Sequence, residues 1–153
     1  KEPKNLLVRL GTPVSALIEA AGGLPDGDCK IVNGGPMMGR AMSNPEAPVT
    51  KGCSGITILG GADAERRTSS NCIKCARCVA ACPMGLEPYL LSKMAQKRGW
   101  EALEAGDIAS CIECGCCSVS CPAYLPLLDW IRLGKQTVMG ILRARAAANT
   151  PKK

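Results

Sequence analysis

Short apolar runs separated by glycine and proline characterise residues 1–62. These runs have the length and aliphatic content of strands, and they cover residues 5–10, 28–33, 48–50 and 55–59. One helical pattern interrupts them, with apolar residues on a single face at Val14, Leu17, Ile18 and Ala21. Several strands and one helix in so short a segment predict a small unit of the α+β class.

Local signals mark both ends of this predicted helix. Thr12 is a suitable N-cap, Pro13 suits the first helical position, and Gly22-Gly23 suits a left-handed end. Residues 34–39 (Gly-Gly-Pro-Met-Met-Gly) lack the strand-to-helix setting of a nucleotide-binding loop and have no P-loop Lys-Ser/Thr pair. We therefore interpret this segment as a tight turn.

The rest of the chain is mainly helical in pattern. Residues 63–70 are polar and charged, and we interpret them as a linker to a second domain at residues 71–153. In that domain, Pro88 opens a helix that ends at Gly99, and residues 100–105 form a second short helix. A long helix starts at Pro126, with apolar or small residues in register at Leu127, Ile131, Gly134, Val138 and Leu142.

Two cysteine runs share the spacing C-x2-C-x2-C-x3-C-P. The first begins at Cys72 and ends at Cys82-Pro83, and the second begins 39 residues later at Cys111 and ends at Cys121-Pro122. This spacing is the ligand run of bacterial two-cluster ferredoxins, in which the fourth cysteine binds the other cluster. Three closely spaced cysteines can wrap one cubane, and the fourth, about one helical turn further on, faces the opposite way. The repetition indicates an internal duplication.

This pattern predicts two 4Fe-4S clusters with crossed ligation. The ligands of the first cluster would be Cys72, Cys75, Cys78 and Cys121. Those of the second would be Cys111, Cys114, Cys117 and Cys82. The three remaining cysteines are not ligands in this scheme: Cys116 should point away from the cubane, and Cys29 and Cys53 are predicted to be small buried apolar residues.

Other uses of these cysteines are less compatible with the sequence. Zinc sites of four cysteines usually consist of two separated C-x2-C pairs, without a third cysteine or a Cys-Pro ending. The chain has no histidine, which excludes covalent haem, Rieske ligation and two-histidine zinc fingers. A disulfide scaffold requires an oxidising compartment, and the total of 11 cysteines is odd.

Composition and charge limit the remaining functions. In this chain of 153 residues, only 3% are aromatic and none is Phe, so the core must be thin and the clusters should hold the second domain together. The formal charge is +6; eight ligating thiolates contribute −8 and two oxidised cores +4, which would leave +2. We expect no nucleic-acid partner, because two Trp, two Tyr and no recognition motif are present.

The basic residues near the C-terminus are expected to form a solvated helix face; they are Arg132, Lys135, Arg143, Arg145, Lys152 and Lys153. No apolar run is long enough to span a membrane, and eight reduced thiolates indicate the cytoplasmic side. The start at Lys1 without Met indicates a part of a longer protein.

Charges inside the ligand loops predict different reduction potentials. Lys74 and Arg77 lie between the ligands of the first cluster. Glu113 takes the place of Lys74 in the second run, and no basic residue accompanies it there. Because nearby positive charge favours the addition of an electron, the first cluster should be reduced more easily.

Several motifs together resemble one family. They are Gly11-Thr12-Pro13, residues 33–39 (Asn-Gly-Gly-Pro-Met-Met-Gly), residues 50–55 (Thr-Lys-Gly-Cys-Ser-Gly) and both cysteine runs. They are similar to the C subunit of the Rnf (Rsx) electron-transport complex. The resemblance implies an SLBB β-grasp domain at residues 1–62, followed by an α-helical two-cluster ferredoxin domain.

The resemblance also implies a function. The family's complex couples electron transfer between ferredoxin and NAD to sodium or proton movement across the cytoplasmic membrane. Its C subunit would lie on the cytoplasmic face of this membrane as a peripheral protein, beside other subunits of the complex, among them a ferredoxin-type subunit. FMN and NAD would be bound by an upstream domain that this chain lacks.

An electron relay requires no acid, base or nucleophile, so no catalytic residue is assigned in this chain. The chain alone would transfer electrons, and enzymatic activity would belong to the whole complex. Two alternatives remain: an iron–sulfur subunit of a soluble dehydrogenase of the succinate or glycolate oxidase kind, and a cysteine-rich binding module that holds zinc.

Overall fold

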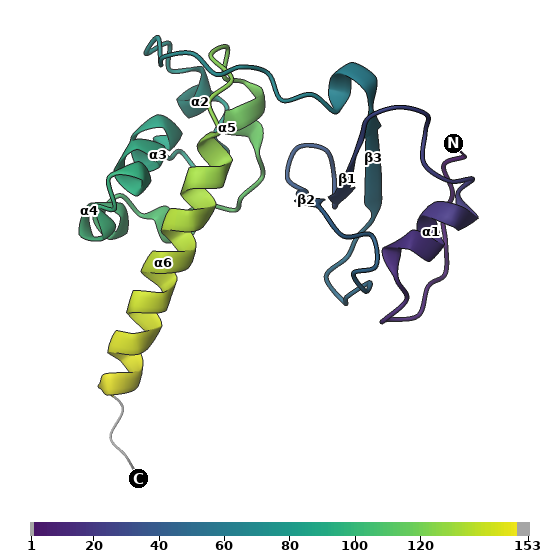
Figure 1. Ribbon diagram of the computed structural model, residues 1–153. Coiled ribbons are helices and arrows are strands. Elements are labelled where there is room, and N and C mark those ends of the chain that lie inside the picture. Colours follow the sequence, from purple (N-terminus) through teal and green to yellow (C-terminus); the bar gives the residue numbers. More distant parts are fainter. Residues whose placement is uncertain (1, 150–153) are drawn as a thin grey trace. The chain divides into compact units, whose positions relative to one another are not determined.

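The computed structural model describes residues 2–149, which divide into two compact units between Arg67 and Thr68 (Figure 1). The first unit contains a small sheet and one α-helix, and the second is helical. The α+β class predicted from the sequence is therefore confirmed. Lys152 and Lys153 lie outside the described residues.

The first unit is built on a three-stranded antiparallel sheet with the order β2-β1-β3. The strands are β1 (Cys29–Asn33), β2 (Arg40–Met42) and β3 (Ile56–Gly60), and a 3-10 turn, η1 (Gly61–Asp63), follows. Ile31 of the central strand lies opposite Met42 on one side and Ile58 on the other. Helix α1 (Val14–Ala20) contributes Val14 and Ile18 to the same core, so the apolar face predicted for this helix is its buried face.

Residues 34–39 connect β1 to β2 as a hairpin loop. The amide of Gly39 donates to the carbonyl of Gly35 at 2.7 Å, and the hydroxyl of Thr57 donates to the carbonyl of Gly34 at 2.8 Å. The segment is thus a turn held to β3. The sequence did not predict β2, because three residues of mixed polarity carry no alternation signal.

Two of the strand predictions for this unit are wrong. The described structure has no strand at residues 5–10 or 48–50, and only an isolated bridge joins Pro13 to Pro48. Both of these residues lack the amide hydrogen that a ladder needs. Leu7 is fully exposed and Leu6 and Leu10 are also exposed, so most apolar side chains of residues 5–10 lie in solvent.

The start of α1 also differs from the expectation. Pro13 is the N-cap residue, and the Thr12 hydroxyl donates to the carbonyl of Arg9 at 2.9 Å instead of capping the helix. The first free amides, those of Val14 and Ser15, donate to backbone carbonyls of residues 45–47. These carbonyls satisfy the amides that a side-chain cap would otherwise satisfy.

The end of α1 is as predicted. Gly22 and Gly23 have φ values of 86° and 83°. Their amides donate to the carbonyls of Glu19 and Ile18, both at 2.9 Å, which is a Schellman motif.

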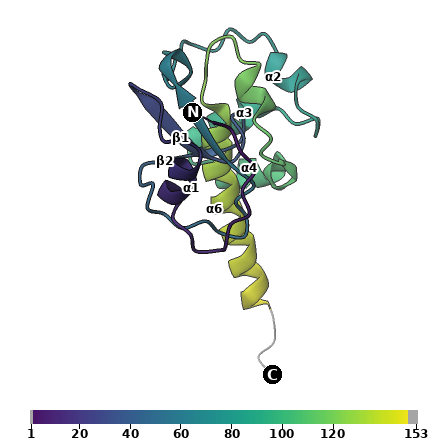
Figure 2. The ribbon, with the colours of Figure 1, turned by 90° about the vertical axis from the view of Figure 1, so that its right-hand side faces the viewer.

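The second unit is organised along its longest helix, α6 (Leu127–Ala148). Helices α3 (Pro88–Gln96) and α4 (Trp100–Ala105) and the 3-10 turn η2 (Ile108–Ser110) pack against α6 (Figures 1 and 2). Two one-turn helices, α2 (Arg77–Ala80) and α5 (Cys116–Val119), pack against each other. The core residues include Leu91, Ala95, Leu103, Ile108, Ile131 and Val138.

Gly134 lets the elements of this core approach closely. A Cβ atom at this position would lie 3.0 Å from both Leu103 Cδ1 and Ile108 Cδ1. The small residue predicted on the inner face of the long helix is therefore the point where α4 and η2 meet α6.

The duplication predicted from the cysteine spacing is present in the backbone. Lys74 and Ala76 in the first run have left-handed backbone conformations, and so do Glu113 and Gly115, the equivalent residues of the second run. Each run continues into a one-turn helix, α2 or α5, and then into a longer helix, α3 or α6. Among the described residues, no helix has the length and apolar character that a membrane crossing requires.

Candidate metal centre

The ligand loops have a backbone suited to an anion. In each loop, every second residue between the first and third cysteines is left-handed: φ is 55° at Lys74 and 58° at Ala76, and 57° at Glu113 and 82° at Gly115. Alternation of this kind turns successive amide groups towards one side and forms an anion-binding nest, as at many iron–sulfur sites. Three of these four residues are not glycine, so each loop holds conformations that side chains disfavour.

Four of the predicted ligands surround one large cavity of about 720 Å³. They are Cys72, Cys75 and Cys78 of the first run and Cys121 of the second. Lys74, Tyr89 and Lys93 also line this cavity, and none of its lining residues is acidic. The cavity is far larger than the space of one water molecule, about 30 Å³. Donor type, grouping and volume therefore all fit a cubane.

The other four predicted ligands line a second, small cavity of about 20 Å³. They are Cys111, Cys114 and Cys117 of the second run and Cys82 of the first, and apolar side chains of Leu91, Leu128 and Ile131 surround them. The donor type and the grouping fit a cubane here as well, but the volume of this cavity does not, because it is smaller than the space of one water molecule. The structure thus brings the eight cysteines together in the two crossed sets named from the sequence.

Among the described residues, no three cysteine or carboxylate side chains converge closely enough to bind a single metal ion. A cubane does not require such convergence, because each of its irons takes one thiolate and the four ligands surround a larger core.

The two sets of cysteines differ in burial. Cys72 and Cys75 are exposed, whereas their equivalents Cys111 and Cys114 are half-buried. Burial raises the pKa of Cys117 to about 11, and it also raises the pKa of Cys78 and of Cys111. At Cys111 the backbone amide of Glu113, 3.4 Å from the sulfur, acts in the opposite direction and lowers the pKa. These thiols therefore have to lose protons when they bind metal.

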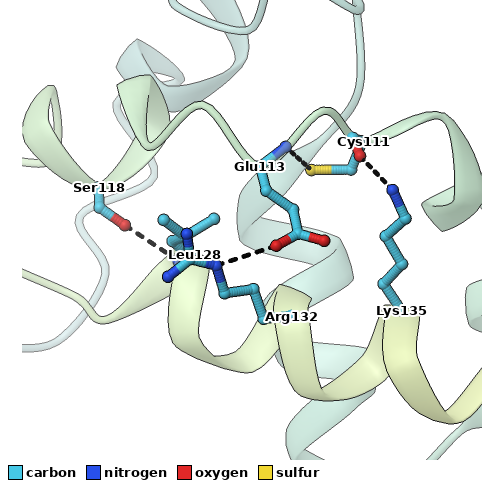
Figure 3. Close-up of polar contacts among 6 residues, drawn as sticks. All are labelled: Cys111, Glu113, Ser118, Leu128, Arg132 and Lys135. Atoms are coloured by element: carbon cyan, nitrogen blue, oxygen red, sulfur yellow. Dashed lines mark hydrogen bonds and ion pairs between the residues drawn. The ribbon is translucent and has the colours of Figure 1, made fainter. Parts of the chain in front are cut away.

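Helix α6 fastens the loop of the second run (Figure 3). Arg132 Nε lies 3.0 Å from Glu113 Oε2, and the ammonium group of Lys135 donates to the carbonyl of Cys111. The amide of Leu128 donates to the hydroxyl of Ser118 at 3.0 Å. Three contacts from successive turns of one helix thus hold the second loop.

This arrangement corrects two expectations. Arg132 and Lys135 are not part of a solvated face, because both reach the second ligand run. Glu113 is accompanied by a basic residue, which comes from a distant part of the chain. One signal in the sequence could have indicated this residue: in the duplication, Arg132 holds the position in the second copy that Lys93 holds in the first.

Further along α6, Arg143 is exposed as expected. Arg145 pairs with Glu104 at 2.9 Å.

The remaining cysteines lie outside both sets. Cys116 lines neither cavity, and a hydrogen bond with Cys114 raises its pKa. Cys29 and Cys53 belong to the first unit and are half-buried instead of fully buried.

Two known protein families match successive parts of the chain. Residues 1–41 match the SLBB domain, and residues 71–125 match the 4Fe-4S dicluster domain. The second match contains all eight predicted ligands and supports iron–sulfur clusters as the cofactor.

Several curated proteins are similar to most of the chain. The C subunit of the proton-translocating ferredoxin:NAD(+) oxidoreductase complex of Clostridium ljungdahlii is 50% identical over 97 residues, which are 63% of this chain and 21% of that protein. The C subunit of the Na(+)-translocating ferredoxin:NAD(+) oxidoreductase complex of Acetobacterium woodii is 40% identical over 139 residues, 91% of this chain and 31% of that protein. The C subunit of the ion-translocating oxidoreductase complex of Erwinia tasmaniensis is 38% identical over 149 residues, 96% of this chain and 18% of that protein.

The resemblance to the C subunit of the Rnf complex is therefore confirmed. The chain spans less than a third of the length of each of these relatives.

Proposed function

We propose that this chain, a relative of the Rnf C subunit, is the electron-relay part of an ion-translocating ferredoxin:NAD oxidoreductase complex. The observation that carries the proposal is that eight cysteines line two cavities, four at each. Each run contributes its fourth cysteine to the cavity of the other run. The names of the relatives supply the kind of complex.

In this proposal, the first site consists of Cys72, Cys75, Cys78 and Cys121, and the second of Cys111, Cys114, Cys117 and Cys82. The 4Fe-4S clusters supply the one-electron chemistry when bound, and the protein positions them and sets their surroundings. No residue of this chain has to donate or accept a proton.

In this proposal, α2 and α5 connect the two sites. Cys78 lies in α2 and Cys82 two residues after its end, so this single turn reaches both sites. Cys117 and Cys121 are related to α5 in the same way, and α2 packs against α5. A short connection between sites is what an electron relay needs.

We further propose that residues 1–62 form an SLBB domain that acts as a spacer or docking surface. Residues 63–70 would be the linker, and residues 71–153 the cluster domain. FMN and NAD would be bound upstream of this region. The protein would be peripheral, on the cytoplasmic face of the membrane, with other complex subunits, among them a ferredoxin-type subunit, as partners and without nucleic acid.

Metal analysis and EPR spectroscopy of the anaerobically purified chain test the relay. We expect about eight irons and eight sulfides per chain and the signals of two reduced 4Fe-4S clusters, since two cubanes contain that many atoms. Zinc at about one or two ions per chain, without visible absorbance, would instead identify a zinc-binding module.

A further inference from the structure

The two copies of the cluster motif differ in what they present to solvent. In the first copy, Cys72 and Cys75 are exposed; in the second, the equivalent Cys111 and Cys114 are half-buried. Contacts from α6 cover the second loop, through Arg132 on Glu113 and Lys135 on the carbonyl of Cys111. An electron carrier from outside therefore approaches the first site more closely than the second.

The two copies of the cluster motif also differ in the charged residues around their sites. Lys74 and Lys93 are exposed residues that line the first cavity, and no residue that lines it is acidic. Neither lysine forms an ion pair with a described residue. At the equivalent positions, the second copy has Glu113 and Arg132, which neutralise each other at 3.0 Å. The second site keeps one further positive charge, Lys135, but this side chain is half-buried and donates to the carbonyl of Cys111. The exposed positive charge therefore lies at the first site.

Apolar surface accompanies these charges. Ile73 is 67% exposed and lies beside Lys74, and Tyr89 is 37% exposed and lies one helical turn before Lys93. Both side chains line the first cavity. An apolar patch with charges of one sign around it is typical of surfaces where electron-transfer proteins dock briefly, because charge steers the encounter and apolar contact completes it.

We propose that Ile73, Lys74, Tyr89 and Lys93 form a docking surface, here called the first-site rim, for an acidic iron–sulfur electron-carrier protein. The first site is then where electrons pass between this chain and its partner, and the second site is internal. One electron moves in each encounter, so one protein is oxidised and the other reduced by one electron. No bond forms or breaks, and no proton moves.

This inference rests on the proposed function, since it requires a cluster in the first site. A different role for the two lysines is to balance the charge of that cluster. The two roles have different consequences: a balancing charge changes the reduction potential for every donor, whereas a docking charge changes the affinity for an acidic protein and its dependence on salt.

The test compares the iron-loaded parent chain with the double variant Lys74→Gln/Lys93→Gln. Its control is Arg143→Gln, because Arg143 is an exposed basic residue of the same unit that lines neither cavity. The probe is an oxidised two-cluster ferredoxin of low isoelectric point. Its dissociation constant is measured by isothermal titration calorimetry at low and at high salt. In a second measurement, stopped flow compares the rates of reduction by the reduced ferredoxin and by reduced methyl viologen.

We expect the double variant to weaken ferredoxin binding about three- to tenfold at low salt, with little difference at high salt. Reduction by ferredoxin should slow clearly more than reduction by the cationic viologen, because a lower potential of the first site affects both donors, whereas the lost docking charge affects ferredoxin alone. Arg143→Gln should behave as the parent in all measurements.

Three results would overturn the docking surface: unchanged ferredoxin affinity in the double variant, an equal loss in Arg143→Gln, or equal slowing with both donors. In each of these cases about eight irons and both EPR signals would remain, so the relay would stand. A parent chain without clusters would refute the relay and the docking surface together.

Discussion

Glu113 and Arg132 form an ion pair that joins the second ligand loop to helix α6. The Glu113 Oε2 and Arg132 Nε atoms are 3.0 Å apart, and both side chains are largely shielded, with exposed fractions of 30% and 17%. The carboxylate is the only acidic group inside either ligand loop. Its charge at the second site is therefore balanced by a residue 19 positions further along the chain.

Removal of either partner should shift the potential of the second site. Arg132→Gln leaves the Glu113 charge unbalanced, and because negative charge opposes the addition of an electron, the potential should fall. Glu113→Gln should raise it. A unit charge about 7 Å away at an effective dielectric near 20 is worth about 100 mV, and solvent screening reduces this value to some tens of mV. EPR-monitored redox titration measures both shifts.

The matched control for these variants is Arg145→Gln. It breaks another arginine–glutamate pair of α6, with Glu104 at 2.9 Å, but this pair lies outside the ligand loops. We expect it to leave both potentials unchanged. If Arg132→Gln and Glu113→Gln have no more effect than Arg145→Gln, the ion pair does not tune the site.

We still predict that the first site has the higher reduction potential, but the difference should be smaller than the charges inside the two loops alone would give. Lys74 and Lys93 line the first cavity, and Arg77 lies between ligands of the first run. At the second site Arg132 neutralises Glu113, and Lys135 adds one positive charge. The first site should still be reduced more easily, and Lys74→Gln should lower its potential. Equal midpoints in the parent, with no response to Lys74→Gln, would show that loop charge does not set the order.

Crossed ligation predicts that loss of the fourth cysteine damages the opposite site. Cys82 lines the second cavity and Cys121 the first. Cys82→Ala should therefore lose or convert the second cluster, and about four irons should remain in an intact first cluster. The remaining EPR signal should respond to an added Lys74→Gln and not to an added Arg132→Gln.

Cys121→Ala is the reciprocal control, and its remaining signal should respond to Arg132→Gln alone. If the signal left in Cys82→Ala responds instead to Arg132→Gln, each run binds its own cluster and the crossing is wrong.

The parts of the structure predicted correctly from sequence depend on local spacing. The intervals between cysteines, the prolines at the starts of α3 and α6, and the glycines after α1 act within a few residues, so their effect can be predicted without knowledge of the fold. The duplication is readable for the same reason, because its copies lie in register along the chain.

The errors arise where a distant segment decides the result. Residues 5–10 have the composition of a strand, but a strand requires a neighbouring strand, and the described residues provide none. Arg132 belongs to a helix whose polar positions face either solvent or the loop of Glu113, and helical periodicity alone does not distinguish the two. Tertiary contact, not local preference, decides both cases.

The three cysteines outside the ligand sets should be dispensable for iron binding. Cys29 and Cys53 lie in the first unit, and Cys116 lines neither cavity although it neighbours Cys114. Each change to Ser should leave about eight irons per chain and both EPR signals. Cys116→Ser is the most informative of the three, because loss of about four irons in this variant alone would make Cys116 a ligand in place of a neighbour.

Gly39 provides a test of the hairpin loop in the first unit. A Cβ atom on Gly39 would collide with Val32 Cγ1 and would lie 2.6 Å from the carbonyl oxygen of Gly35. Val32 is a buried residue of the central strand, and the Gly35 carbonyl accepts the hydrogen bond that closes the loop, so neither can move without cost. Gly39→Ala should therefore destabilise this unit by about 1–3 kcal/mol, as other overpacked sites do.

Gly35→Ala is the control for this change, because no atom lies within 4 Å of the position its Cβ would take and its φ is not in the left-handed region. It should alter stability by less than about 0.5 kcal/mol. Hydrogen exchange measured by mass spectrometry separates the units: in Gly39→Ala, peptides from residues 28–42 should exchange faster, whereas peptides from α6 should exchange as in the parent. The iron content should stay at about eight, since no ligand lies in the first unit. Equal protection of residues 28–42 in Gly39→Ala and Gly35→Ala would show that the loop does not need its close approach to β1.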